Sequence, residues 1–147
     1  RIFGIAANEH PSAQDSAQIY SDNATQKTYK ILAHLCGEVL DAGLSVIIDA
    51  TNLRHWQRQV LQEVANERGV PVCIAFCEAS MSVIQEWIQK RSLEGVDASD
   101  ADINVVFKQI NTLEPLNKEE LMQAITIHSN ILEETNVLVS EIKKHLR

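Results

Sequence analysis

The chain has 147 residues, 45% of them hydrophobic, and a formal net charge of −7 at pH 7. This length and composition suit a single domain, residues 1–147, with a packed core. The acidic balance argues against a general nucleic-acid-binding surface, and no apolar run approaches the roughly 20 residues that would span a membrane. Because the three cysteines are odd in number and no signal peptide pattern is present, we expect buried thiols in a reducing cytoplasm.

The first half of the chain predicts a long helix, a buried strand and a second helix. Ser21-Asp22 is typical of a helix N-cap, and the long helix should run from there to about residue 42, where Gly43 ends it. Residues 46–48 are continuously apolar, which is typical of a parallel strand buried on both faces. Asn52 is a good N-cap for the next helix, predicted over residues 53–67.

The second half continues the alternation of strands and helices. Strands are expected at residues 70–77 and 124–128, and a closing helix at residues 133–146 with Ile142 and Leu146 facing inward. Two helices within residues 81–112, separated by Gly95, form a predicted helical lid. Alternating strands and helices indicate an α/β fold, with a parallel sheet and flanking helices.

Asp49 is the strongest functional candidate from its position alone. It ends the apolar run of residues 46–48, and ligands of α/β proteins collect at the carboxyl ends of parallel strands. A carboxylate there could hold Mg²⁺ through water or accept a proton from a substrate hydroxyl. The simpler alternative is that Asp49 satisfies amides of the following loop or caps a helix.

The residues after Asp49 add polar groups to the same place. Thr51 and Asn52 could contact a ligand, although helix capping is the simpler interpretation of Asn52. Arg54 lies in the first turn of a predicted helix, where a cation is unfavourable to the helix dipole, so it could hold an anion instead of being solvated. Arg91 ends the first lid helix and could stabilise a transferring phosphoryl group or merely complement the helix dipole.

Other common catalytic patterns are missing from the sequence. None of the five glycines opens a Gly-x-x-x-x-Gly-Lys-Ser/Thr loop, and no Gly-x-Gly-x-x-Gly pattern is present. The 147 residues therefore show no nucleotide phosphate site of their own. His55 and His128 lie near the expected ligand edge without a partner at catalytic spacing, and His34 is expected to be structural.

The order of several short motifs resembles the P-loop kinases of the zeta-toxin and polynucleotide-kinase-like group. The nearest likeness is to predicted kinase domains that often follow an aminoglycoside-phosphotransferase-like domain. The motifs, which cover most of the chain, are Arg1-Ile2-Phe3-Gly4, Ile19-Tyr20-Ser21, Val46-Ile47-Ile48-Asp49-Ala50-Thr51-Asn52, Gly69-Val70-Pro71, Arg91, the acidic run at residues 97–102, and Glu114-Pro115-Leu116.

The resemblance implies a three-layer P-loop-kinase-like fold, truncated at its N-terminus so that the phosphate loop is missing. It implies that Asp49 lies beside a Mg²⁺–phosphate site and that Arg91 is a lid arginine. ATP and Mg²⁺ would serve the full-length parent, with a small-molecule or nucleotide phosphate acceptor, and this fragment would bind neither and be inactive. The residues implied to lie near the substrate or phosphates are Arg1, Thr51, Asn52 and Arg54.

One departure from the family supports an alternative function. The lid helix of the family commonly carries Arg-Ile-x-x-Arg, whereas Trp87 occupies the first arginine position here. The alternative is a non-catalytic α/β module that binds a protein partner. In addition, the missing phosphate-loop strand would leave strand edges exposed, which predicts a homodimer or a rearranged sheet for the isolated fragment.

Overall fold

The computed structural model describes residues 22–94, 103–128 and 135–146. Its first part is a pair of packed helices, α2 (Asp22–Asp41) and α3 (His55–Asn66). The predicted long helix is confirmed, and it ends before Gly43, whose φ of 76° is the left-handed conformation that glycine adopts readily. The face of α2 that packs inward buries Tyr29 and Cys36, which form part of a small core, whereas Leu35 on the same helix is 49% exposed.

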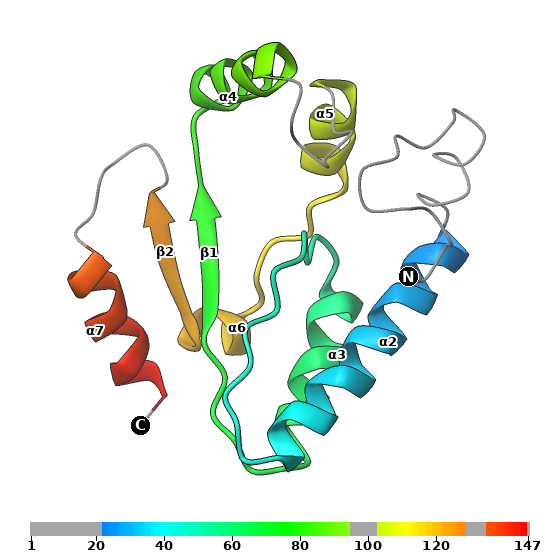
Figure 1. The fold of residues 1–147 in the computed structure, drawn as a ribbon, viewed down its shortest axis with the longest axis vertical. Helices are drawn as coiled ribbons and strands as arrows, with labels where there is room; N and C mark the ends of the chain where they lie inside the picture. Colours follow the sequence, from blue (N-terminus) through cyan, green and yellow to red (C-terminus); the bar gives the residue numbers. More distant parts are fainter. Residues whose placement is uncertain (1–21, 95–102, 129–134, 147) are drawn as a thin grey trace.

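The sheet consists of two parallel strands, β1 (Ile74–Glu78) and β2 (Ala124–His128). Ile74 lies opposite Ala124, and the pairing continues to Glu78 opposite His128. α7 (Thr135–His145) lies on one side of this pair, and α2 and α3 lie on the other (Figure 1). The α/β character, the parallel sheet and the strand at residues 124–128 are therefore confirmed, while the first strand begins four residues later than expected.

The predicted buried strand at residues 46–48 is wrong. Residues 44–49 form no strand, and Ile47 and Leu44 are 94% and 63% exposed. A strand exists only where a neighbour completes its hydrogen-bond ladder, and no strand in the described part of the chain pairs with these residues. Residues 46–48 are apolar, as a buried strand requires, but an apolar sequence alone does not supply the neighbouring strand. We refer to residues 44–48 as the free apolar segment.

Two helices lie beyond the carboxyl end of β1, at the top of Figure 1. They are α4 (Met81–Glu94) and α5 (Ile103–Thr112), and they match the predicted helical pair. Ser80 accepts a hydrogen bond from the Val83 N–H at 3.4 Å, as expected for an N-cap. Gly95 and the acidic residues 97–102 lie outside the described residues. Phe107 and Ile110 on α5 are 48% and 46% exposed, so this helix is weakly packed.

The short helix α6 (Lys118–Met122) leads directly into β2. Its N-cap Asn117 accepts a hydrogen bond from the Glu120 N–H at 2.9 Å, and the Glu120 carboxylate accepts one from the Asn117 N–H at 2.8 Å. This reciprocal capping box explains why so short a helix forms here.

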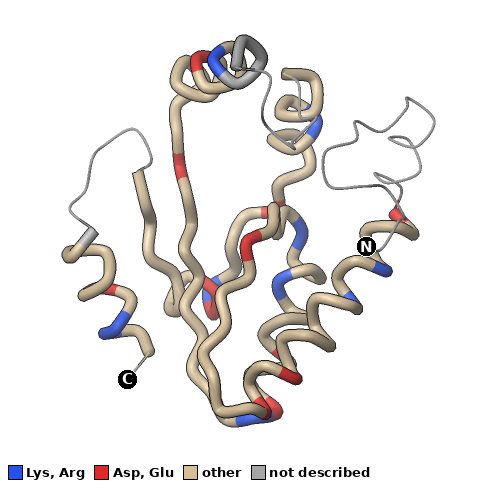
Figure 2. Tube along the Cα trace, in the orientation of Figure 1, with Lys and Arg blue, Asp and Glu red and all other residues tan. Residues whose placement is uncertain are grey.

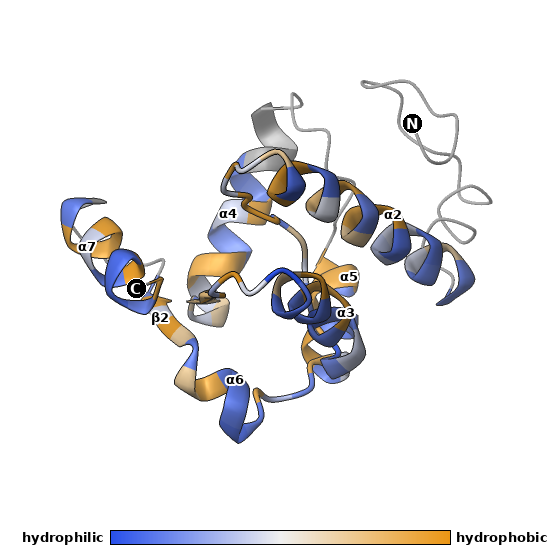
Figure 3. Ribbon diagram, turned by 90° about the horizontal axis from the view of Figure 1, so that it is seen from below, coloured by the Kyte–Doolittle hydropathy of each residue, from blue (hydrophilic) through white to orange (hydrophobic). Residues whose placement is uncertain are grey.

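The small sheet leaves several residues more exposed than we expected. Cys36 is buried, but Cys73 is only half-buried and Cys77 is exposed, so the prediction of three buried thiols is wrong for Cys77. Leu146 is 42% exposed, so it does not face inward as predicted. The side chain of His34, which we expected to be structural, is 73% exposed and lies 3.7 Å from Glu38 Oε1. Figure 3 shows hydrophobic and hydrophilic residues mixed along α7. The main packing partner of this helix is β2.

An ion pair links the C-terminal end of α2 to the residues just after α3, where charged residues lie close together at the bottom of Figure 2. The Arg68 guanidinium donates to both carboxylate oxygens of Asp41, at 2.8 Å and 2.9 Å. These bonds hold the pKa of the Asp41 carboxyl below its usual value. In the part of the chain that the structure describes, no helix has the length and apolar character needed to span a membrane.

Candidate functional site

The loop of residues 49–54 is shaped by the side chain and backbone of Asn52. Among the described residues, Asn52 is the non-glycine residue with a positive φ, 46°. Its N–H donates to the Tyr29 hydroxyl oxygen at 3.0 Å, and the Tyr29 hydroxyl donates to Asn52 Oδ1 at 3.1 Å. Asn52 Nδ2 donates to the Ala50 carbonyl oxygen at 3.2 Å. Asn52 is thus tied to α2 across 23 residues of sequence.

These bonds overturn the prediction that Asn52 caps α3. The helix begins at His55, and Arg54 occupies the N-cap position with extended backbone angles. Gln57 fills part of the capping role, because its Oε1 accepts the Arg54 N–H at 2.9 Å. The Glu114 carboxylate, from a distant loop, accepts the His55 N–H at 2.6 Å. The N–H groups of Arg54 and His55 are therefore satisfied by Gln57 and by Glu114, not by Asn52.

Arg58 fixes the same loop from the other side. Its side chain is 5% exposed, and its Nη1 donates to the carbonyl oxygens of Asn52 and Leu53, at 2.9 Å and 3.2 Å. Its Nε donates to Glu120 Oε1 at 2.7 Å and its Nη2 to Glu120 Oε2 at 3.2 Å. One planar guanidinium thus joins the loop before α3 to α6, in the two-pronged geometry typical of arginine–carboxylate pairs.

Glu120 is the most buried charged group of the described residues, with a side chain that is 1% exposed. Burial by itself would raise the pKa of this carboxyl, but the hydrogen bonds from Arg58 and the Asn117 N–H outweigh burial, and the pKa is lowered. His55 Nδ1 lies 3.3 Å from Glu120 Oε1 and adds to this effect. Glu120 therefore remains ionised and holds Arg58 in place.

Sequence reasoning missed Tyr29, Arg58 and Glu120, although together they build the loop. The sequence did hold one signal, since Asn117 followed three residues later by Glu120 is a capping box pattern. Nothing local indicated that the Glu120 carboxylate would also meet Arg58, 62 residues earlier in the chain.

The structure brings some of the predicted site residues together. Asp49, Thr51 and Arg54 occupy the same short loop, with Asp49 and Thr51 exposed and the Arg54 side chain 40% exposed. Arg54 Nη1 lies 3.7 Å from Asp22 Oδ1 at the start of α2, an exposed ion pair of small energetic value. Arg1 lies outside the described residues, and Arg91 belongs to α4, but its side chain is not among those described.

The acidic groups of the described residues offer little to a metal ion by themselves. No group of three or more His, Cys, Asp or Glu side chains in the described ranges is arranged to hold one. Asp49 provides a single exposed carboxylate. Mg²⁺ commonly takes only one or two protein carboxylates and completes its shell with water and substrate phosphates. The donor set at the loop therefore fits Mg²⁺ only when phosphate oxygens accompany the ion.

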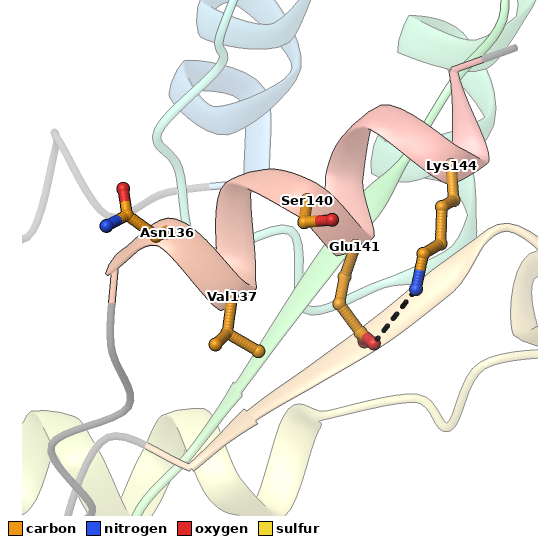
Figure 4. Close-up of a pocket in the computed structure, with 5 residues that line it drawn as sticks. All are labelled: Asn136, Val137, Ser140, Glu141 and Lys144. Carbon is orange, nitrogen blue, oxygen red and sulfur yellow. Dashed lines mark ion pairs between the residues drawn. The ribbon is translucent and has the colours of Figure 1, made fainter.

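One open hollow lies on the outer face of α7, with a volume of about 240 Å³. Figure 4 shows its lining side chains, all from this helix, including the 3.9 Å ion pair between Lys144 and Glu141. α7 and the loop of residues 49–54 lie on opposite sides of the β1–β2 pair (Figure 1). The hollow therefore contributes nothing to the loop site.

Comparison with known proteins gives one match. A family model described as an AAA domain matches residues 2–116, which include the loop of residues 49–54, Arg58 and both helices of the predicted lid. Neither the curated proteins nor the solved structures gave a match.

Proposed function

Because the chain belongs to the AAA domain family, a P-loop kinase-like family, we propose that it is the C-terminal part of an ATP-dependent phosphotransferase. The observation that carries the proposal is the loop of residues 49–54. It presents an exposed carboxylate, hydroxyl and guanidinium on a backbone that Tyr29 and Arg58 hold from two sides. We further propose that the protein belongs to the zeta-toxin and polynucleotide-kinase-like group of these kinases.

In this proposal Asp49 carries the central chemistry. Its carboxylate would hold Mg²⁺ together with nucleotide phosphates, or accept the proton of the attacking substrate hydroxyl. Either role requires an accessible carboxylate, and Asp49 is exposed. When bound, Mg²⁺ supplies neutralisation of charge on the transferring phosphoryl group.

The acceptor substrate would lie beside Thr51 and Arg54. The Thr51 hydroxyl can donate to or accept from a polar substrate, and the Arg54 guanidinium can hold an anionic group such as a phosphate. The weak, exposed pairing of Arg54 with Asp22 leaves its guanidinium available to a ligand. Arg1 is proposed to contribute to the same binding site, and Arg91 to stabilise the transferred group from the lid.

The nucleotide phosphates need a cradle that these 147 residues do not contain, since the sequence has no glycine-rich phosphate loop. We propose that residues of the natural protein outside this sequence supply that loop and the strand before it. The free apolar segment supports this idea, because its 94% exposed Ile47 is an apolar side chain without a cover. The 147-residue chain alone is then inactive, and its uncovered edges favour pairing with a second copy.

The test uses the natural full-length protein with ATP and Mg²⁺, and measures transfer of the γ-phosphate to a panel of nucleotides, nucleosides and small hydroxyl compounds. The Asp49→Asn variant is expected to lose roughly 100-fold in kcat, the scale of a lost proton acceptor or metal ligand. Glu119→Gln, which neutralises an exposed carboxylate on α6, serves as the matched control and should keep wild-type activity. A full-length protein that binds no ATP, or an Asp49→Asn variant of normal activity, would contradict the proposal.

A second candidate function rests on Trp87, which is 43% exposed on α4 at a position where the resembling kinases carry an arginine. An exposed aromatic side chain is better suited to contact with a protein than to phosphate binding. In this alternative the domain is a non-catalytic module that binds a partner protein. A full-length protein that neither binds nor hydrolyses ATP would favour this alternative.

A further inference from the structure

Asn52 stands in the middle of the proposed substrate loop, yet its polar atoms are engaged within the protein. Its N–H and Oδ1 are both bonded to the Tyr29 hydroxyl, its Nδ2 to the Ala50 carbonyl oxygen, and its own carbonyl oxygen to Arg58 Nη1 at 2.9 Å. Thr51 and Arg54, on either side of it, are more open to a ligand, as one is exposed and the other has a side chain 40% exposed.

Tyr29 is itself held firmly. The residue is 4% exposed, and its ring meets the Trp56 ring edge-on, with 5.4 Å between the centroids and 68° between the planes. Its hydroxyl therefore reaches the loop from a fixed position in the α2–α3 core. Such a hydroxyl, with a donor bond and an acceptor bond to the same residue, fixes both the side chain and the backbone of that residue.

Asn52 also has an unusual backbone conformation, which sets the path of the loop. A φ of 46° is uncommon for residues other than glycine, and asparagine tolerates it better than most residues do. This left-handed residue lies in the loop between Asp49 and Arg54. The direction in which the carboxylate and the guanidinium leave the loop therefore depends on the conformation of Asn52.

We infer that Tyr29, Asn52 and Arg58 are positioning residues, a clamp that orients Asp49, Thr51 and Arg54 toward substrate, and that Asn52 is not itself a substrate ligand. The inference rests on the proposed phosphotransferase function for its kinetic consequence. The existence of the clamp does not depend on that function, because it follows from the hydrogen bonds alone.

The kinetic test compares two replacements of Asn52 in the natural full-length protein. Asn52→Gly removes the side chain but adopts a positive φ without strain, whereas Asn52→Ala removes the side chain and disfavours that φ. The clamp predicts that Asn52→Gly loses less than about threefold in kcat/KM for the acceptor, while Asn52→Ala loses roughly tenfold or more. Equal, large losses in both Asn52 variants, together with normal kinetics in Tyr29→Phe, would instead identify Asn52 as a ligand and overturn the inference.

A third variant, Tyr29→Phe, removes one hydroxyl and keeps the ring that packs against Trp56. We expect it to lose roughly tenfold in kcat/KM for the acceptor with an unchanged KM for ATP, because only the acceptor loop is loosened. Thr28→Val is the matched control, since the Thr28 hydroxyl bonds to the Ala24 carbonyl oxygen of its own helix. Normal kinetics in Tyr29→Phe would overturn the positioning role.

Hydrogen exchange separates failure of this inference from failure of the proposed function. The Asn52 amide should exchange roughly tenfold faster in Tyr29→Phe than in the wild-type protein, and at the wild-type rate in Thr28→Val, whether or not the protein has phosphotransferase activity. A full-length protein with this exchange pattern and no activity refutes the proposed function and leaves the clamp supported. Unchanged exchange at Asn52 in Tyr29→Phe refutes the clamp directly.

Discussion

Two neighbouring stretches of this chain differ in whether their groups find partners within the protein. In residues 49–58 the polar groups of Asn52 and Arg58 are bonded within the protein, and Arg58 is 5% exposed. In the free apolar segment just before them, Ile47 is 94% exposed and residues 44–48 have no strand partner among the described residues. Side chains from distant elements can complete a polar loop one bond at a time, whereas an apolar strand needs a whole neighbouring strand.

The largest expected effect comes from breaking the buried pair that holds the polar stretch. Arg58→Met leaves the Glu120 carboxylate buried without its main partner and should lower the free energy of unfolding by about 3–5 kcal/mol. Denaturant unfolding followed by circular dichroism measures this change. Lys118→Met removes an exposed cation near Glu120 as a control and should change stability by less than about 0.5 kcal/mol.

The double variant Arg58→Met with Glu120→Leu tests whether the loss comes from the orphaned charge. We expect it to be more stable than Arg58→Met alone, since no buried charge then remains unpaired. If Arg58→Met unfolds within about 1 kcal/mol of the wild-type protein, the pair does not hold this region and the comparison fails.

Acid should weaken the same region, by less than the removal of Arg58. The pKa of Glu120 is lower in the folded protein than its ordinary value of 4.5, so its contribution to stability is present above that value and is lost as the pH falls through the lowered folded pKa. The pH dependence of the unfolding free energy, measured between pH 7 and pH 3, should be shallower in Glu120→Gln. Parallel curves for the two proteins would show that Glu120 is not linked to folding.

A smaller effect is expected from the ring contact beneath the loop. A double-mutant cycle with Tyr29→Leu and Trp56→Leu should give a coupling energy of about 0.5–1.5 kcal/mol, the range for edge-on aromatic pairs. Tyr29→Phe, which keeps the ring, serves as the reference that isolates the hydroxyl. Additive single effects would mean that the rings do not cooperate in supporting Asn52.

The smallest effect is expected in the free apolar segment. In the 147-residue chain, Ile47→Thr should change the unfolding free energy by less than about 0.5 kcal/mol, because the side chain loses no contacts. The same substitution at Ile125, which is 6% exposed in β2, should cost more than about 1 kcal/mol and is the matched control.

The same pair of variants in the natural full-length protein sharpens the comparison. If a strand from outside the 147 residues covers the free apolar segment, Ile47→Thr should there become as destabilising as Ile125→Thr. An Ile47→Thr variant that remains neutral in the full-length protein would show that the segment stays uncovered and would remove that support for a missing strand.

Much of the fold was predictable because local signals decide helices. The end of α2 at Gly43, the cap at Ser80 and the capping box of Asn117 with Glu120 each act within a few residues. The strand at residues 46–48 was predicted wrongly because pairing depends on a neighbour that no local pattern specifies. The exposure of Cys77 and Leu146 was missed for the same reason, since burial depends on how much structure surrounds a residue.

For this protein, the sequence alone determined the α/β class, the positions of the helices and the candidate loop with Asp49, Thr51 and Arg54. It also showed that a glycine-rich phosphate loop is absent from the 147 residues. Only the tertiary structure decided that Asn52 bonds to Tyr29 instead of capping α3, and that Arg58 meets Glu120 across 62 residues. The physical reason is range, because caps and helical periodicity act within one or two turns, whereas a buried hydroxyl or guanidinium finds its partners only after distant elements have packed together.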